Sequence, residues 1–191
     1  MNIPAKMILF SIIIPLIGAA IYALFVTEQD NFHQITKGEA YRSAQMDRDK
    51  LMYCLRNYHI RSILNLRGKD LLENWYIDEL KISEECNVIH YDVSLSAYAE
   101  PTKEETQILM NIIKAAPRPI LIHCQAGADR TGLVAAMWKV IVDKESKGEA
   151  SKQLSILYGH LPLGPAFAMD QFFNNWRPEL EPVYCAVSRE K

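Results

Sequence analysis

Residues 120–132 read Ile120-Leu-Ile-His-Cys-Gln-Ala-Gly-Ala-Asp-Arg-Thr-Gly132, and this stretch divides into three parts. The apolar run from Ile120 to Ile122 is typical of a buried strand in a parallel sheet. Residues 124–130 form a loop of mostly small residues, and the chain from Thr131 onward is apolar on nearly all sides, as in a buried helix. A strand that leads through a loop into a helix directs backbone N–H groups and the helix dipole into the loop. The stretch therefore predicts an anion-binding site.

The loop carries a cysteine and, six residues later, an arginine. A thiol near a helix N-terminus and a guanidinium loses its proton easily, and pKa values of about 3.5–7.5 occur in such settings. The planar fork of Arg130 suits two oxygens of one phosphate group. We therefore expect Cys124 to attack phosphorus while backbone amides and Arg130 stabilise the charge on the phosphoryl oxygens. In this scheme the Thr131 hydroxyl donates to the sulfur, and His123 fixes the loop.

The pattern His123-Cys124-x5-Arg130-Thr131 resembles the signature loop of the cysteine-dependent protein tyrosine and dual-specificity phosphatases. Tyr41-Arg42-Ser43 resembles the entry to the core of their bacterial dual-specificity-like branch. The resemblance implies a metal-independent phosphomonoester hydrolase that works through a cysteinyl-phosphate intermediate and needs no cofactor. No His, Cys and Asp cluster in the sequence has zinc-like spacing. The phosphate-binding residues expected from the pattern are Cys124, Gln125, Ala126, Gly127, Ala128, Asp129 and Arg130.

Two substrate classes fit this loop, and we place protein phosphotyrosine (dual-specificity type) first. Asp129 directly precedes Arg130, as the matching residue does in myotubularin-like and Sac-like phosphoinositide phosphatases. The loop has no lysine, however, so a polyanionic inositol ring would find less positive charge there. Phosphoinositides, phospholipids and inositol phosphates are therefore the second class. A phosphate-binding module without activity and a rhodanese-type sulfur transferase are further alternatives, which the intact Cys124, Arg130 and Thr131 argue against.

The general acid that protonates the leaving oxygen is harder to assign, because the resemblance departs from the family pattern here. Dual-specificity phosphatases carry an Asp on the loop after the second central strand. In this sequence the corresponding loop, residues 96–101, contains only Glu100. Asp92 comes earlier, within the expected strand, where a structural role is favoured. Asp129 lies inside the signature loop, so we place it slightly ahead of Glu100 as the acid.

Composition limits the partners of the chain. The 191 residues carry a formal net charge of −2, which argues against nucleic-acid binding because such proteins show a basic excess. Charged residues make up 23% and hydrophobic residues 49%, as in an ordinary globular domain. The expected partners are a phosphorylated protein, or a phosphorylated lipid or inositol, and a membrane.

The membrane is expected because residues 7–26 contain no charged residue and are long enough to span a bilayer. A cleaved signal peptide is the alternative, with Gly18-Ala19-Ala20 as a cleavage site. The apolar run continues beyond that site, so we favour an uncleaved anchor. This predicts a single-pass membrane protein whose catalytic domain lies outside the cytoplasm, in the periplasm if the source is bacterial.

Alternating strand-like and helix-like segments predict an α/β fold, with a central, mostly parallel sheet flanked by helices, preceded by the transmembrane helix. A hairpin with its turn at Lys37-Gly38, a capping box at Thr102-Glu105, a second central strand over residues 87–95 and a helix over residues 149–158 are expected. We expect Arg42 to be a packing and hydrogen-bonding residue rather than a substrate contact, and His160 to have a surface or packing role rather than a place at the pocket rim. The predicted domains are a tail (1–6), an anchor (7–26), a linker (27–31), a phosphatase domain (32–180) and a C-terminal tail (181–191).

Overall fold

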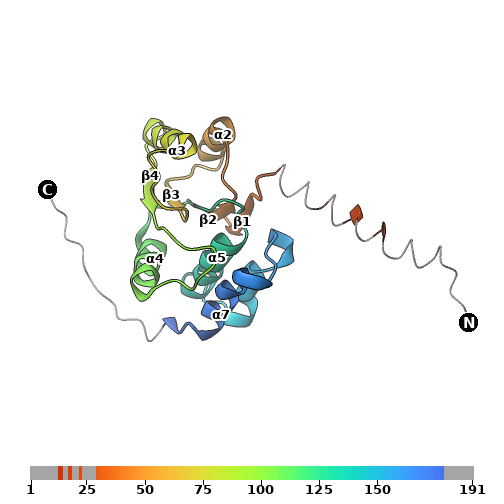
Figure 1. Cartoon of the computed structure of the whole chain (residues 1–191). Coiled ribbons are helices and arrows are strands. Elements are labelled where there is room, and N and C mark those ends of the chain that lie inside the picture. The colour runs from red at the N-terminus through yellow and green to blue at the C-terminus, as the bar shows by residue number, and fades with distance from the viewer. Residues whose placement is uncertain (1–12, 15–16, 19–21, 23–28, 179–191) are drawn as a thin grey trace, which may run out of the picture.

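The computed structural model of the chain describes residues 13–14, 17–18, 22 and 29–178. Figure 1 shows a central sheet with helices on both faces. The strands are β1 (His33–Thr36), β2 (Ala40–Ser43), β3 (Ser62–Asn65), β4 (Ile89–Asp92) and β5 (Ile120–His123). The helices are α2 (Arg48–Asn57), α3 (Asn74–Glu85), α4 (Lys103–Ala115), α5 (Asp129–Ile141), α6 (Lys147–Ala150) and α7 (Phe167–Asn175). Three 3₁₀ turns, η1 (Ser151–Gln153), η2 (Ile156–Tyr158) and η3 (Gly164–Ala166), lie between α6 and α7.

The sheet is mixed, and its strand order is β1-β2-β5-β3-β4. β1 and β2 form an antiparallel hairpin, whereas β2, β5, β3 and β4 are parallel. β5 therefore lies in the centre, with a parallel neighbour on each side. Its last residue, His123, pairs with Ser43 of β2 and Asn65 of β3, so these three strands end at the same edge. In open α/β sheets this carboxyl edge is where ligands bind.

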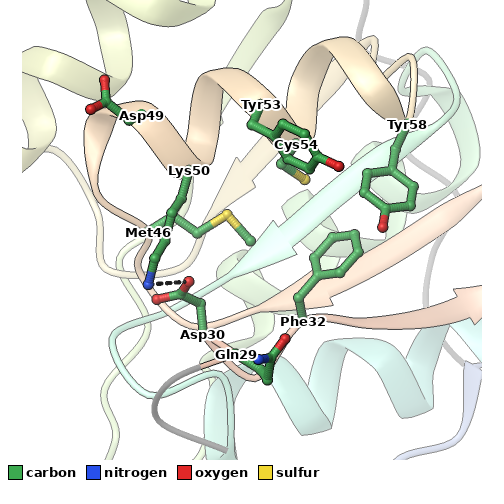
Figure 2. A pocket seen from close by; sticks show the side chains of 9 residues that line it. All are labelled: Gln29, Asp30, Phe32, Met46, Asp49, Lys50, Tyr53, Cys54 and Tyr58. Atoms are coloured by element: carbon green, nitrogen blue, oxygen red, sulfur yellow. Dashed lines mark ion pairs between the residues drawn. The ribbon is translucent and has the colours of Figure 1, made fainter.

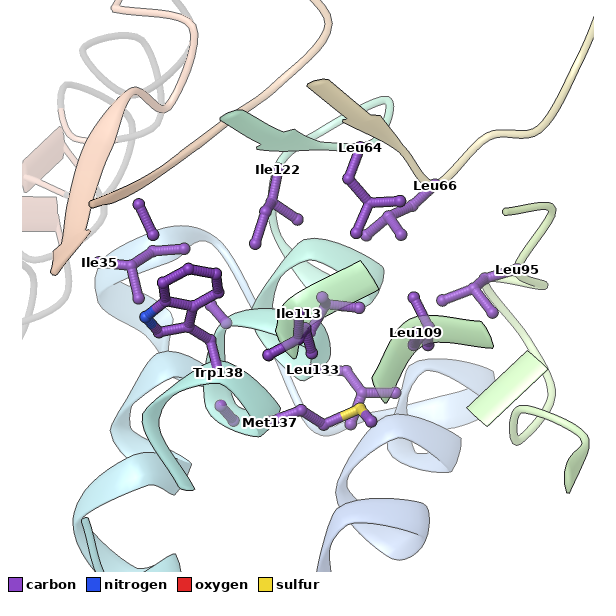
Figure 3. Close-up of a cluster of buried hydrophobic side chains, with 14 of the residues drawn as sticks. Ile35, Leu64, Leu66, Leu95, Leu109, Ile113, Ile122, Leu133, Met137 and Trp138 are labelled. Carbon is purple, nitrogen blue, oxygen red and sulfur yellow. The ribbon is translucent and has the colours of Figure 1, made fainter. Parts of the chain in front are cut away.

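Each face of the sheet is buried against a different group of helices. On one face Tyr41, Ile63 and Leu121 pack with residues of α2 and α3. On the other face Leu64 and Ile122 pack with α4, α5 and α7 (Figure 3). Successive strand residues point to opposite faces, which explains why these strands are apolar without alternation.

Helix α5 forms the centre of the larger core. Its residues from Thr131 to Trp138 are all buried, as the apolar sequence predicts for a helix surrounded by protein. The indole of Trp138 is fully buried, and its Nε1 donates to Thr36 Oγ1 at 3.0 Å, so burial leaves no polar group unpaired there. The signature loop is thus attached to a helix that is buried over most of its length.

Two local predictions are confirmed. Gly38 has φ +71° in the turn between β1 and β2, where glycine avoids the strain of a left-handed conformation. The Thr102 side chain accepts from the Glu105 amide, and the Glu105 carboxylate accepts from the Thr102 amide, which completes the predicted capping box of α4.

Two predicted elements are wrong. β4 is an edge strand, because only β3 pairs with it, and its first residue Ile89 is 48% exposed. The helix predicted over residues 149–158 is instead the four-residue α6 followed by η1 and η2. The left-handed Gly159, with φ +78°, then ends η2.

The predicted transmembrane helix and the single-pass membrane location drawn from it are also corrected. In the part of the chain that the structure describes, no helix is both long enough and apolar enough to cross a membrane. A crossing needs about 20 consecutive apolar helical residues. Of the segment 7–26, residues 7–12, 15–16, 19–21 and 23–26 lie outside the described residues. So do the whole predicted C-terminal tail (181–191) and the last two residues, 179–180, of the predicted phosphatase domain. The other domain boundaries stay predictions.

Candidate active site

The signature loop leaves the centre of the carboxyl edge. β5 ends at His123 and α5 begins at Asp129, so Cys124 to Ala128 form the connection between them. Cys124 follows the central strand directly and is 2% exposed. The predicted order of strand, loop and buried helix is confirmed, with the helix beginning two residues earlier than predicted.

The backbone carbonyls of the loop are bound by groups outside it. Gln125 O accepts from Gln45 N (3.1 Å) and Ala126 O from Asn31 Nδ2 (3.0 Å). Gly127 O accepts from Arg42 Nη2 (2.8 Å), and Ala128 O accepts from Gly132 N (2.8 Å) at the start of α5. The loop is therefore held in place through its carbonyls.

The amide groups of the same loop have no such partners. Among the described residues, the amides of residues 125–130 donate no hydrogen bond. Buried or half-buried amides require an acceptor, and successive free amides at a helix N-terminus form an anion-binding nest. The loop next to Cys124 therefore has free N–H donors of the kind that bind an oxyanion.

Gly127 is required where the loop meets β2. Its φ is +69°, and a Cβ at this position would lie 2.6 Å from Ala44 N and 2.6 Å from Ser43 C. These contacts are with backbone, which cannot move aside as a flexible side chain can. The close approach brings the loop against β2, where Arg42 holds it.

Arg42 is a fully buried residue of β2. Its Nη1 donates to Gln153 O (2.8 Å) and Gln153 Oε1 (2.9 Å), and its Nη2 donates to Gly127 O. The guanidinium also lies 4.0 Å from the centre of the Tyr158 ring. Burial lowers the pKa of Arg42 to about 10, so it stays charged at neutral pH. The structural role expected for Arg42 is confirmed by these contacts.

Arg130 extends across the ends of β3 and β4. Its Nη1 donates to Leu66 O and Leu95 O, each at 3.3 Å. Within the described part of the chain, its Nε and Nη2 make no hydrogen bond and it forms no ion pair. One side of the guanidinium is therefore oriented by the protein, while the donors of the other side remain available for an anion.

His123 is anchored beneath the loop by a residue that the sequence did not single out. Its Nε2 lies 3.1 Å from Glu79 Oε1, and Glu79 also contacts His90 Nε2 (2.8 Å) and Gln45 Nε2 (2.9 Å). Burial raises the pKa of Glu79, but the charge on His123 and the hydrogen bonds from His123, His90 and Gln45 outweigh it and hold the pKa well below its usual range. A signal was present in the sequence, because Glu79 lies three residues from both Tyr76 and Ile82 on the buried side of α3.

The three acidic residues considered as general acid lie in different surroundings. Asp92 accepts from Tyr76 OH (2.6 Å) and Asn65 Nδ2 (2.8 Å), in keeping with its expected structural role. Asp129 Oδ1 lies 2.6 Å from Nδ1 of the buried His160. Glu100 is exposed on the connection between β4 and α4, and Leu95 of this connection contacts Arg130.

A second cation lies beside the loop. Arg67 follows Leu66, whose carbonyl contacts Arg130, and its guanidinium stacks 3.6 Å from the centre of the Trp75 ring. Its Nη1 is 3.4 Å from Gln45 Oε1. Burial and the neighbouring charge of Arg130 lower the pKa of Arg67. The rim of the candidate site thus holds two guanidinium groups.

Two of the residues expected to act in the site have buried polar atoms without partners. Thr131 Oγ1 and His123 Nδ1 are buried and have no hydrogen-bond partner among the described residues. No group of three or more His, Cys, Asp and Glu side chains in the described ranges is arranged to hold a metal ion. The metal-free and cofactor-free mechanism stays a prediction.

Another pocket, of about 470 Å³, lies between α2 and the residues that precede β1 (Figure 2). Its lining includes Phe32, Met46 and Tyr58, with an ion pair between Lys50 and Asp30 (2.8 Å) at one end. None of its lining residues belongs to the signature loop. Its cysteine, Cys54, is a poor nucleophile because burial raises the pKa of that thiol to about 12.

Residues 19–161 match the family PTP-NADK, described as "DSP-PTPase phosphatase fused to NAD+ Kinase". No curated protein matches the chain. The solved structures that resemble it include TpbA of P. aeruginosa, with 20% sequence identity and a TM-score of 0.63, covering 78% of this chain and 87% of TpbA.

Two other solved structures have a similar fold. The core catalytic domain of the PP-IP phosphatase SIW14 from S. cerevisiae, in complex with citrate, has 21% identity and a TM-score of 0.61, with 77% of this chain and 85% of that chain covered. Tk-PTP in its active form has 18% identity and a TM-score of 0.59, with 76% and 98% covered. At these identities the likeness establishes the fold.

Proposed function

The chain belongs to the DSP-PTPase phosphatase family, and on that premise we propose that it hydrolyses phosphomonoesters through a cysteinyl-phosphate at Cys124, with protein phosphotyrosine as the substrate. Family membership makes it a hydrolase of the tyrosine or dual-specificity phosphatase type. The substrate and the role of each residue are our proposals. TpbA, which shares the fold, has also been solved in complex with phosphotyrosine.

The proposal is supported mainly by the signature loop, whose carbonyl groups are hydrogen-bonded while its amide groups are free. Its carbonyls bind donors on the outside, which leaves the amides of residues 125–130 and the free side of Arg130 to surround a phosphoryl group in front of Cys124. Preorganised donors of this kind stabilise the charge on the equatorial oxygens at no reorganisation cost during reaction. The free loop amides distinguish this loop from an ordinary strand-to-helix connection.

In the first step, Cys124 Sγ bonds to phosphorus as the ester P–O bond breaks, and the leaving oxygen takes a proton from the general acid. In the second step, a water oxygen bonds to phosphorus and the S–P bond breaks, releasing inorganic phosphate. The water proton returns to the carboxylate that acted as acid. Thr131, whose buried hydroxyl has no partner among the described residues, donates to the departing sulfur. His123 holds the base of the loop on Glu79.

We assign the acid to Glu100 rather than to Asp129, which reverses the order expected from the sequence. Asp129 already binds His160, whereas Glu100 is exposed on the connection that contacts Arg130. Glu100→Gln should lose about 10²-fold or more in kcat on phenyl phosphate and much less on a nitrophenyl ester, whose leaving group needs no proton. Asp129→Asn should change the activity by the same factor on both substrates. The opposite pattern would restore Asp129 as the acid.

The experiment that tests the function compares the full chain with Cys124→Ser on an aryl phosphate and on phosphotyrosine peptides. Cys124→Ser should lose turnover and keep phosphate binding, because the loop amides and Arg130 remain. Cys54→Ser, at a buried cysteine outside the loop, should keep turnover. Normal activity in Cys124→Ser would refute the mechanism. Phosphate binding without turnover in the unaltered chain would identify the non-enzymatic phosphate-binding alternative.

Arg67 favours a second candidate substrate, an inositol phosphate or a phosphoinositide. Two guanidiniums close together repel each other, and in the described part of the chain neither forms an ion pair, so a substrate with a second phosphate would relieve the repulsion. SIW14, of the same fold, is a PP-IP phosphatase. In this case Arg67→Gln should raise KM for polyphosphorylated inositols on the order of tenfold and leave phosphotyrosine peptides unaffected. Arg61→Gln, at the other end of β3 and exposed, is the matched control.

A further inference from the structure

His160 is a fully buried histidine that lies between two carboxylates. Its Nδ1 is 2.6 Å from Asp129 Oδ1 at the start of α5, and its Nε2 is 2.8 Å from Asp170 Oδ2 on α7. Asp129 and Asp170 retain 30% and 20% of their side-chain exposure. The imidazole therefore joins the first turn of the signature helix to the last helix of the domain.

The geometry determines how many protons this cluster holds. Each short N···O contact needs one hydrogen, and a neutral imidazole carries only one N–H. Two contacts with carboxylates are therefore satisfied when His160 is an imidazolium. Burial lowers the pKa of His160, but the hydrogen bonds to Asp129 and Asp170 and their negative charges outweigh it, so the pKa is raised.

The segment that carries His160 also supports the loop at two other points. Gln153, at the end of η1, accepts from Arg42, which holds the Gly127 carbonyl. Tyr158 O accepts from Asn31 Nδ2, and the same amide group holds the Ala126 carbonyl. Residues 153–160 thus support the loop through Arg42 and Asn31, and His160 adds a direct contact with the Asp129 carboxylate.

The contact between His160 and Asp129 affects the charge of the signature loop. Asp129 places a carboxylate directly before Arg130, in a loop built to bind a phosphate dianion. The Asp129 carboxylate and the phosphate dianion repel each other, and in a partly buried site this repulsion weakens phosphate binding. A cation on the far side of Asp129 offsets that charge and orients the carboxylate away from the phosphate.

We propose that His160 is a positioning residue of the active site, which as an imidazolium neutralises Asp129 and fixes the first turn of α5, and with it Arg130, on α7. The proposal rests on the proposed function of the loop. The titratable groups that face the ring are Asp129 from α5 and Asp170 from α7. Because His160 loses its second proton as pH rises through its raised pKa, phosphate binding should weaken over that range.

The test measures kcat, KM and inhibition by inorganic phosphate in the full chain and its variants. His160→Gln should raise KM and the phosphate inhibition constant on the order of tenfold, because Asp129 then faces the dianion uncompensated. Adding Asp129→Asn to His160→Gln should restore most of the lost affinity. His59→Gln, at an exposed histidine, should leave both constants unchanged.

A structural role alone predicts a different result. If His160 contributed only to packing, His160→Gln would lower the melting temperature and leave KM and the phosphate inhibition constant unchanged. Unchanged constants would overturn the proposal, and so would a loss of affinity that the added Asp129→Asn does not reverse.

An NMR titration of the His160 ring provides a readout that does not depend on turnover. The ring pKa should be above the ordinary histidine value and should fall in Asp170→Asn, a change that does not touch the loop. If the unaltered chain had no phosphatase activity but showed this titration and bound phosphate, the proposed function would be refuted and the positioning role of His160 would be retained. A ring that titrates at or below the ordinary value would refute the positioning role.

Discussion

Replacing Gly127 by alanine tests whether the close approach of the loop to β2 controls catalysis. The new Cβ would lie 2.6 Å from Ser43 C, whereas carbon atoms pack at about 3.5–4.0 Å. The backbone of β2 is held by ladder hydrogen bonds on both sides, so the loop has to move by about 1 Å to make room. A displacement of that size costs about 10²-fold in rate.

Gly38→Ala is the matched control, because Gly38 has nearly the same φ (+71°) and no atom within 4 Å of its new Cβ. It should show only the strain of a left-handed alanine, about 1–2 kcal/mol, and keep kcat/KM. Gly127→Ala should show that strain plus an overpacking cost of about 1–3 kcal/mol.

The assay measures kcat/KM on an aryl phosphate and the free energy of unfolding from urea titrations. Gly127→Ala should be less stable than Gly38→Ala and about 10²-fold less active. If the two variants had the same kcat/KM, the position of the loop against β2 would not control catalysis. If they had the same unfolding free energy, the backbone contacts of Gly127 would contribute nothing to stability.

Two other variants test the groups on either side of the loop. Arg130→Lys should reduce kcat by about 10²–10³-fold, because a point charge cannot replace the fork that binds two oxygens, whereas Arg61→Lys should have no effect; equal activity in both would refute the role of Arg130. Glu79→Gln should lower the free energy of unfolding at pH 7 by about 2–3 kcal/mol, since the hydrogen bonds from His123 and His90 lose their charged acceptor. The pKa of Glu79 is depressed in the folded state, so its contribution to stability is complete above the unfolded-state pKa of about 4.3 and decreases as the pH falls below that value. In urea titrations from pH 7 to pH 3, the unfolding free energies of the unaltered chain and of Glu79→Gln should therefore converge. A constant difference over that range would contradict the assignment.

The parts of the fold that the sequence predicted are those governed by short-range physics. The apolar run before Cys124 and the apolar helix after it depend on periodicity over a few residues, and both are present. The capping box at Thr102 and the turn at Gly38 depend on contacts within three residues of each other. The resemblance carried by Cys124, Arg130 and Thr131 is local in the same sense, and the family match confirms it.

Only the tertiary structure determined which distant groups meet at the loop. Asn31 and Arg42 bind carbonyls that lie 95 and 85 residues away, and no periodicity encodes such a pairing. The position of β4 in the sheet also depends on distant contacts. The sequence pattern predicted a central strand, but the strand order places β4 at an edge.

The surroundings of Asp129 give another example. Asp129 and Glu100 are both carboxyl groups in the sequence, but only the structure shows that a histidine 31 residues after Asp129 folds back to bind it, and our proposal that Glu100 is the acid depends on this contact. Residue type and spacing determine which chemistry is available to a loop. The protonation and direction of each side chain depend on neighbours that only chain folding brings within a few ångströms, where electrostatic interactions are strong enough to decide them.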